Sequence, residues 1–356
     1  MSPDAPSSAA SPQIVYRTPP DPERRVYLAF RIHAVLATLA EEGIASEMAL
    51  AGSGLDAKRL TDPDTRVSYR QLETVARNAL RLSKDPAIAL RAGRRMHITA
   101  YGTYGYANLC AATVSDAIAF GVKYHRIAGS VVDMAFSTDG QNAVYAYEPL
   151  IWSDPSQDLY RFAIEFALAS HLTVIQDLVG KAAKPVRVSV AYPPPAHARA
   201  YRTRLQCRVD FLQPNNEMAF DAAWIAKPLP LANPIAFASC SEMCDRLLGE
   251  LSADGSLASE IRSALIMHPG RFPDAEAMAE QLAMHPRALR RRLNTEKTSY
   301  RHLLAEVRSR LAIEYLRRTK MTSEEIANRL GYSDAANFRR AFTSWTGKNP
   351  SDFRIR

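Results

Sequence analysis

A short segment near the C-terminus, Pro286–Leu293, is unusually rich in arginine. Proline suits the first position of a helix, and a two-turn helix here would have only Leu289 and Leu293 as apolar contacts. The other long side chains are guanidinium groups, on Arg287, Arg290, Arg291 and Arg292. Arginine makes bidentate hydrogen bonds to guanine and to phosphate. With a short helix expected just before it, the segment predicts a helix–turn–helix at about 274–293, with its second helix in a DNA major groove.

A second helix–turn–helix is predicted at about 323–345. Thr322 and Glu325 form a capping box, and Gly331 supplies the left-handed residue that ends the first helix. Ser333 can cap the next helix, Asp334–Trp345, whose Phe, Ala and Trp side chains have the spacing of a buried face. The positions left facing outward are Ala335, Asn337, Arg339 and Arg340.

One helix is expected to join the two modules. Residues 299–318 carry an apolar stripe at helical spacing, and about 20 residues at ~1.5 Å each span roughly 30 Å. Successive major-groove openings on one face of B-DNA lie ~34 Å apart. The two modules can therefore read adjacent segments of one groove.

The charge distribution favours the same partner. Residues 271–356 contain 18 Lys and Arg against 10 Asp and Glu, a net charge of +8, whereas residues 1–270 contain 27 of each sign and are neutral. A basic module attached to a neutral body is typical of a protein that binds phosphates. The alternative is a basic domain that is merely soluble.

The preceding chain predicts a mixed α+β body. Helical spacing is found at 24–42, 68–83, from Pro86, at 113–128 and at 157–179. Strand-like runs at 131–136 and 143–147 flank Asp139-Gly140, which predicts a hairpin. Further short strands are expected at 186–190, near Phe211 and at 218–220.

These patterns divide the chain into four parts. Residues 1–22 form a Pro- and Ser-rich disordered arm, 23–226 the α+β body, 227–272 a helical linker and candidate dimerisation segment, and 273–356 the all-α basic domain. The boundary is placed at the break His268–Pro273, where the charge changes.

Other function classes find little support in the sequence. Four cysteines are too few for a disulfide scaffold, and Cys240 and Cys244 are interpreted as core residues rather than metal ligands. No phosphate loop, dinucleotide fingerprint or nucleophile elbow is present. The apolar run 26–40 is too short and too charged to span a bilayer. We therefore predict a cytoplasmic protein without catalytic residues, cofactor, metal or membrane association.

The C-terminal domain resembles the DNA-binding domain of the AraC/XylS family of bacterial transcription regulators. The residues that carry the resemblance are Ile326-Ala327, Leu330-Gly331-Tyr332-Ser333, Asn337-Phe338, Arg340-Ala341-Phe342, Trp345-Thr346-Gly347, Pro350-Ser351 and Phe353-Arg354, with Leu289-Arg290-Arg291, Leu293 and Thr298-Ser299-Tyr300 upstream. The body is similar to the arabinose-binding-type effector domain of that family, through Leu60–Val67, Asp85–Arg91 and Glu165–Leu168.

The resemblance implies a DNA-binding transcription regulator controlled by a small-molecule effector. It places base and phosphate contacts on Arg287, Arg290 and Arg291 in the first module and on Ala335, Asn337, Arg339 and Arg340 in the second. It also implies activation through RNA polymerase and favours a homodimer. The first module departs from the family at Ala283, where glycine is common, which predicts a differently shaped turn. His285 in place of Ser or Thr predicts a weaker helix cap.

The effector pocket is expected among aromatic and polar residues of the body, because small-molecule sites are mostly apolar with a few convergent polar groups. The candidates are Tyr101, Tyr104, Tyr106, Tyr124, His125 and Arg126, with His97 and His171 as further polar candidates. The alternative for each aromatic residue is a place in the core. A regulator that binds DNA without any ligand, and whose N-terminal domain serves only dimerisation or protein contacts, also remains open.

Overall fold

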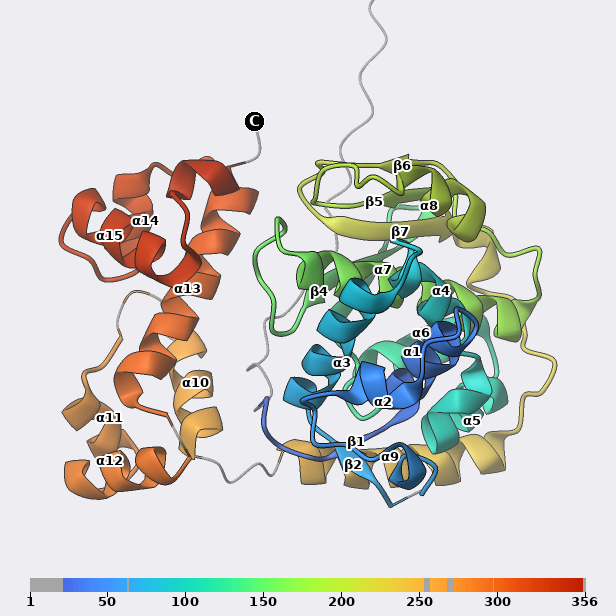
Figure 1. The fold of residues 1–356 in the computed structure, drawn as a ribbon, viewed down its shortest axis with the longest axis horizontal. Coiled ribbons are helices and arrows are strands. Elements are labelled where there is room, and N and C mark those ends of the chain that lie inside the picture. Colours follow the sequence, from blue (N-terminus) through green and yellow to red (C-terminus); the bar gives the residue numbers. More distant parts are fainter. Residues whose placement is uncertain are drawn as a thin grey trace, which may run out of the picture. The chain divides into compact units, whose positions relative to one another are not determined.

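The computed structural model describes residues 22–62, 64–252, 257–267, 270, 272–296 and 298–354. The described residues divide into two compact units, the first ending at Ser252 (Figure 1). The predicted arm, 1–22, lies outside the described residues except for Pro22.

The N-terminal unit is the expected α+β body. Its first half contains β1 (Tyr27–Leu28), α1 (Phe30–Ala40), α2 (Ser46–Leu50), η1 (Ala57–Arg59), β2 (Arg66–Val67), α3 (Tyr69–Leu82), α4 (Ile88–Arg94), η2 (Ile98–Tyr101), α5 (Gly102–Cys110) and α6 (Val114–Tyr124). Its second half contains β3 (Val132–Thr138), β4 (Asn142–Pro149), α7 (Asp158–Val179), β5 (Arg187–Ser189), α8 (Ala198–Leu205), β6 (Val209–Asp210), β7 (Asn216–Asp221), η3 (Ala222–Trp224) and α9 (Pro234–Ser252).

A five-stranded sheet is built around the predicted hairpin. Its strand order is β3-β4-β7-β5-β6, antiparallel except for the β5–β6 pair. The hairpin turn forms because Asp139 Oδ1 accepts the backbone N–H groups of Gln141 and Asn142, at 3.1 and 2.6 Å. Gly140 adopts a φ of +88°, which suits glycine. The sheet therefore begins where the Asp-Gly signal places it.

The long helix α7 is the central element of the N-terminal unit. It contacts α3, α4 and α8 as well as strands β3 and β4, and Figure 1 shows it in the middle of the unit. It is long and apolar enough to cross a membrane, but 72% of its most apolar window is buried inside the protein. Gly93 allows α4 to pack closely on it, since a Cβ there would lie 2.5 Å from the Phe166 carbonyl oxygen. We conclude that α7 is a core helix.

The C-terminal unit is all-helical. It contains α10 (Leu257–Met267), α11 (Ala275–Gln281), α12 (Pro286–Thr295), α13 (Tyr300–Arg318), α14 (Ser323–Arg329), α15 (Ala335–Thr346) and η4 (Pro350–Phe353). Figure 1 shows α11 and α12 at one end of α13, and α14 and α15 at the other. The two predicted helix–turn–helix modules and the helix joining them are therefore present at the predicted residues.

The division between the units differs from the predicted boundary at 268–273. Helix α10, which the sequence placed in the linker, buries Leu257, Ile261 and Leu265 in the C-terminal core. Glu296 accepts hydrogen bonds from the backbone N–H groups of Leu257 and Ala258, both at 2.9 Å. The boundary predicted from the change in charge left α10 out of the basic domain, because α10 contributes apolar packing to that domain and almost no net charge.

Candidate nucleic-acid interface and effector cavity

Helix α12 is packed through one narrow stripe and exposes the rest of its surface. Leu289 and Leu293 are buried, whereas Arg287, Arg290, Arg291 and Arg292 are all exposed. The exposed side includes a shallow concave surface lined by Arg287, Arg290, Arg291, Asn294 and Thr295. The packing stripe fixes the rotation of α12, so the three arginines expected to contact DNA point away from the core.

The turn before α12 corrects the expectation that Ala283 changes its shape, and it shows how His285 caps the helix. Ala283 adopts a left-handed φ of +51°, so the turn keeps this conformation without glycine. The strain on a non-glycine residue there is on the order of 1 kcal/mol. His285 is a working N-cap, because its Nδ1 accepts the backbone N–H of Arg287 at 3.3 Å. A ring nitrogen here performs the task that usually falls to a Ser or Asp oxygen.

Helix α15 is also held by an apolar face, with Phe338 and Phe342 fully buried. Its N-cap is Asp334 rather than the expected Ser333, because the Asp334 carboxylate accepts the backbone N–H of Asn337 at 2.7 Å. The carboxylate is the stronger acceptor, and the Ser333 hydroxyl donates to it at 2.9 Å. This hydrogen bonding lowers the pKa of Asp334.

The outward residues of α15 form a small ordered network. The Asn337 amide donates to Asp334 Oδ2 at 2.6 Å, and Arg340 Nη2 donates to Asn337 Oδ1 at 2.7 Å. Arg339 and Arg340 are exposed, while Ala335 and Asn337 are half-buried. Asn337 and Arg340 are therefore held next to each other, and Arg340 keeps further donors for a base edge or a phosphate.

The two modules are tied to the same helix. Arg308 of α13 lies over the ring of Phe272, which precedes α11, at 5.2 Å, and over the ring of Tyr332, which precedes α15, at 4.8 Å. At ~1.5 Å per residue, the 19 residues of α13 span roughly 28 Å. This length is close to the ~34 Å between major-groove openings.

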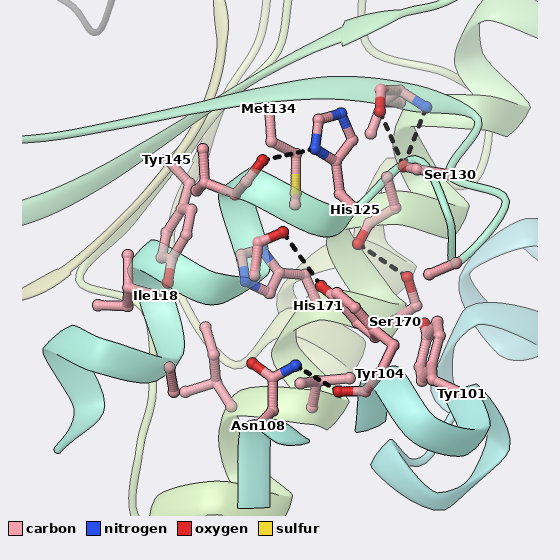
Figure 2. Close-up of a pocket in the computed structure, with 18 of the residues that line it drawn as sticks. Tyr101, Tyr104, Asn108, Ile118, His125, Ser130, Met134, Tyr145, Ser170 and His171 are labelled. Atoms are coloured by element: carbon pink, nitrogen blue, oxygen red, sulfur yellow. Dashed lines mark hydrogen bonds between the residues drawn. The ribbon is translucent and has the colours of Figure 1, made fainter. Parts of the chain in front are cut away.

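A cavity of about 90 Å³ lies inside the N-terminal unit (Figure 2). Residues of α5, α6, α7, β3 and β4 line it, together with Arg31 of α1. One buried water occupies about 10–15 Å³ of such cavity volume, so the cavity has room for roughly six to nine water-sized groups. Of the six effector candidates, Tyr101, Tyr104 and His125 belong to its lining.

The other three candidates lie outside the lining. Tyr106 is 53% exposed. The Tyr124 hydroxyl donates to Asp245 of α9 at 2.6 Å, so it serves to hold two helices together. Arg126 pairs with Asp133 at 3.0 Å. Proximity in sequence to lining residues did not place these side chains in the cavity, since neighbouring helical positions point in different directions.

Burial keeps three polar side chains of the cavity wall uncharged. Burial lowers the pKa of His171 from 6.5 to about 3, so its imidazole carries no charge at neutral pH. The Tyr147 hydroxyl shares a hydrogen bond with His171 Nδ1. Burial raises the pKa values of Tyr145 and Tyr147, which keeps both phenols protonated. The lining also contains the guanidinium group of Arg31.

The sequence did not single out Arg31, although a signal was present. It is a cation within the apolar run of a helix whose neighbours Ile32 and Val35 are fully buried. Asn108, Ser130 and Ser170 of the lining were also missed. Helical periodicity cannot show that segments so distant in the chain converge on one cavity.

Comparison with known proteins decides the family. The family profile described as the arabinose-binding domain of AraC transcription regulators, N-terminal, matches residues 43–229, and a helix-turn-helix domain profile matches residues 278–356. The chain belongs to the AraC family of transcriptional regulators. It is not an enzyme.

Relatives of similar length include other proteins that are named as regulators. The ornithine utilization regulator of Pseudomonas aeruginosa is 36% identical over 322 residues, covering 90% of this chain and 94% of that protein. An uncharacterized HTH-type transcriptional regulator of Mycobacterium tuberculosis is 29% identical over 347 residues, covering 95% and 98% of the two chains. The crystal structure of the regulator CdpR of Pseudomonas aeruginosa covers 92% of this chain and 98% of its own, at 22% identity and a TM-score of 0.47.

Proposed function

We propose that this AraC-family protein binds a specific DNA operator through both helix–turn–helix modules, and that a small molecule bound in the cavity controls this binding. By analogy with the family, it acts in the cytoplasm, at the nucleoid, as an activator that contacts RNA polymerase. The observation that carries the proposal is the outward display of arginines by two helices held on one rod, α13.

Both recognition helices, α12 and α15, offer side chains for DNA contacts. Arg287, Arg290 and Arg291 offer bidentate donors from α12, and Arg339 and Arg340 do so from α15. Asn337 can read an adenine edge, with Arg340 fixed beside it. Ala335 is small enough to contact a thymine methyl group. Positions that read bases confer specificity, while those on phosphates set the register.

The test starts from the operator, identified by selection from random DNA or by mapping the bound sites in cells. Fluorescence anisotropy then measures affinity for the operator as salt is raised. Neutralising about 6–10 phosphates should cost ~10³–10⁵ in affinity between 50 and 200 mM salt. Arg340→Ala should reduce discrimination at one base pair by about 1–3 kcal/mol.

The matched control is Arg301→Ala, because Arg301 is exposed on α13 outside both recognition helices. It should leave base preference unchanged. Equal weakening of all DNA sequences by Arg340→Ala would make Arg340 a phosphate contact. An affinity that does not depend on salt would contradict the proposed interface as a whole.

Effector control is tested separately, by measuring operator affinity with and without compounds that stabilise the protein. A compound that binds the N-terminal unit should shift operator affinity. If every such compound leaves the affinity unchanged, the protein is instead a ligand-independent regulator whose N-terminal domain serves dimerisation or protein contacts.

We also propose that the protein forms a homodimer through α9. Ile235, Met243 and Leu247 are exposed apolar residues on this helix, with exposed fractions of 84%, 42% and 40%. Met243 and Leu247 are one turn apart and share a face. Helix α10, the other part of the predicted dimerisation segment, is packed into the C-terminal core.

Sedimentation velocity tests this dimer. Met243→Glu places a charge on the exposed apolar face of α9 and should convert a dimer to a monomer. Wild-type protein sedimenting as a monomer at micromolar concentration, with and without DNA, would exclude the dimer.

A further inference from the structure

Arg31 is a cation in the cavity that the protein leaves without a counter-ion. Its Nη1 donates to the backbone carbonyl of Ala128, and its Nε is buried with no hydrogen-bond partner. Its guanidinium lies over the rings of Tyr101 and Phe166, at 5.8 and 6.0 Å. Among the residues that the structure describes, no carboxylate pairs with it.

Two other partly buried arginines of the same unit are paired with acids, and a third, Arg94, donates to the side-chain amide oxygen of Gln176 at 3.0 Å. Arg91 lies 2.6 Å from Glu42, and Arg126 lies 3.0 Å from Asp133. Burying a charge without a partner is costly, and Arg31 also leaves its buried Nε without any hydrogen-bond partner. A site that must accept a charged ligand has reason to retain such a cation, because the ligand completes the pair.

The rest of the lining fits an anion with an apolar body. No Asp or Glu side chain is part of it, and its only other basic side chains are His125 and His171. His171 is neutral, and His125 contacts Asp133 at 3.2 Å. Valine, isoleucine, leucine and aromatic side chains make up most of the remaining surface.

We propose that the cavity binds a small monocarboxylate, whose carboxylate pairs with Arg31 and whose apolar chain lies among the tyrosines and α7. This inference rests on the proposed function, since it specifies the effector. A guanidinium and a carboxylate form a bidentate pair in the geometry that arginine favours. A ligand with ammonium groups would find no carboxylate in the lining to receive them.

The test compares three compounds of nearly the same size on the full-length protein. Pentanoate, pentanamide and ornithine share a five-carbon chain and differ in charge, and acetate to octanoate, benzoate and phenylacetate extend the range of shapes. Isothermal titration and thermal denaturation measure binding. We expect at least one carboxylate to bind tenfold or more tightly than its own amide, and pentanoate to bind more tightly than ornithine.

Arg31→Met then removes the charge and keeps a long apolar side chain. It should weaken carboxylate binding about ten- to a hundredfold and leave amide binding unchanged. Arg25→Met is the control, because Arg25 is exposed on the segment before α1. Since Arg31 has no carboxylate partner, the unliganded Arg31→Met protein should melt close to the wild-type temperature.

Several outcomes would overturn the proposal. They are equal binding of carboxylates and amides, unchanged carboxylate binding by a folded Arg31→Met protein, tighter binding of ornithine than of pentanoate, and failure of every carboxylate to bind. If Arg31→Met does not fold, the comparison of carboxylate with amide in the wild-type protein decides. An uncharged compound that occupies the cavity and alters operator affinity would refute the carboxylate while leaving effector control intact. A carboxylate that binds through Arg31 without altering operator affinity would support the carboxylate site and refute effector control.

Discussion

Acidification should destabilise the N-terminal unit through one side chain, His171. Its pKa is lowered from 6.5 to about 3 by burial in the cavity wall. Between these two pH values the unfolded chain binds a proton at this position that the folded protein does not bind. The contribution of His171 to the free energy of unfolding is therefore fully present above about pH 6.5 and is lost as the pH falls toward 3.

The magnitude follows from the two pKa values. Lowering the pH from 7.5 to 5 should cost about 2 kcal/mol of unfolding free energy through His171 alone. Because pH 5 lies well above the folded-state pKa, this cost is set almost entirely by the pKa of the unfolded chain. His171→Gln has no titrating group in this range and should lose this share of the pH dependence.

Urea unfolding followed by tryptophan fluorescence measures the effect. A Trp345→Phe background leaves Trp152 and Trp224 as reporters, both in the N-terminal unit. For each protein, with and without His171→Gln, we take the difference in unfolding free energy between pH 7.5 and pH 5. A loss of stability that the substitution causes equally at both pH values cancels in this difference. Identical pH dependence of the two proteins would refute the reasoning and place a solvated, ordinarily titrating His171 in the cavity.

Three further substitutions test the local physics. Ala283→Gly should raise the unfolding free energy of the C-terminal unit by about 0.5–1 kcal/mol, because it relieves a left-handed alanine; chemical denaturation would show a loss if the turn were unstrained. Gly105→Ala should destabilise the N-terminal unit by about 1–3 kcal/mol, because the added Cβ would meet the Ile98 carbonyl oxygen at 1.9 Å, and an unchanged melting temperature would count against this close contact. Thr322→Ala should cost about 1 kcal/mol by removing the capping box with Glu325, measured as urea unfolding of the C-terminal unit, where no change would mean that the cap is redundant.

The sequence predicted the DNA-binding unit closely, because its signals are local. Helix caps such as Thr322, the left-handed Gly331 and the leucine stripe of α12 act within a few residues. They predicted the bounds of α12, α13 and α15 to within one or two residues. The arginines stand out for the same reason, since a two-turn helix with so few apolar positions cannot bury them.

The errors arose where distant segments decide the outcome. The helix expected over 24–42 begins only at Phe30, because Tyr27 and Leu28 pair with Val67 and Arg66 in a short antiparallel ladder. The role of α10 depends on packing with α13. The cavity draws on segments between Arg31 and Val179, so no local pattern could identify its lining.

The cavity wall is also the support of α9, the last helix of the N-terminal unit. Tyr104 lines the cavity and lies 5.7 Å from the ring of Phe120, which in turn lies 5.5 Å from Phe237 of α9. Tyr124 and Lys123 of α6 bond to Asp245 of the same helix. Close-packed aromatic contacts transmit displacement rather than absorb it. Under the proposed function, a ligand that repacks Tyr104 therefore acts two side chains away from α9. The chain continues from α9 into the DNA-binding unit, so this short series of contacts is sufficient for effector control.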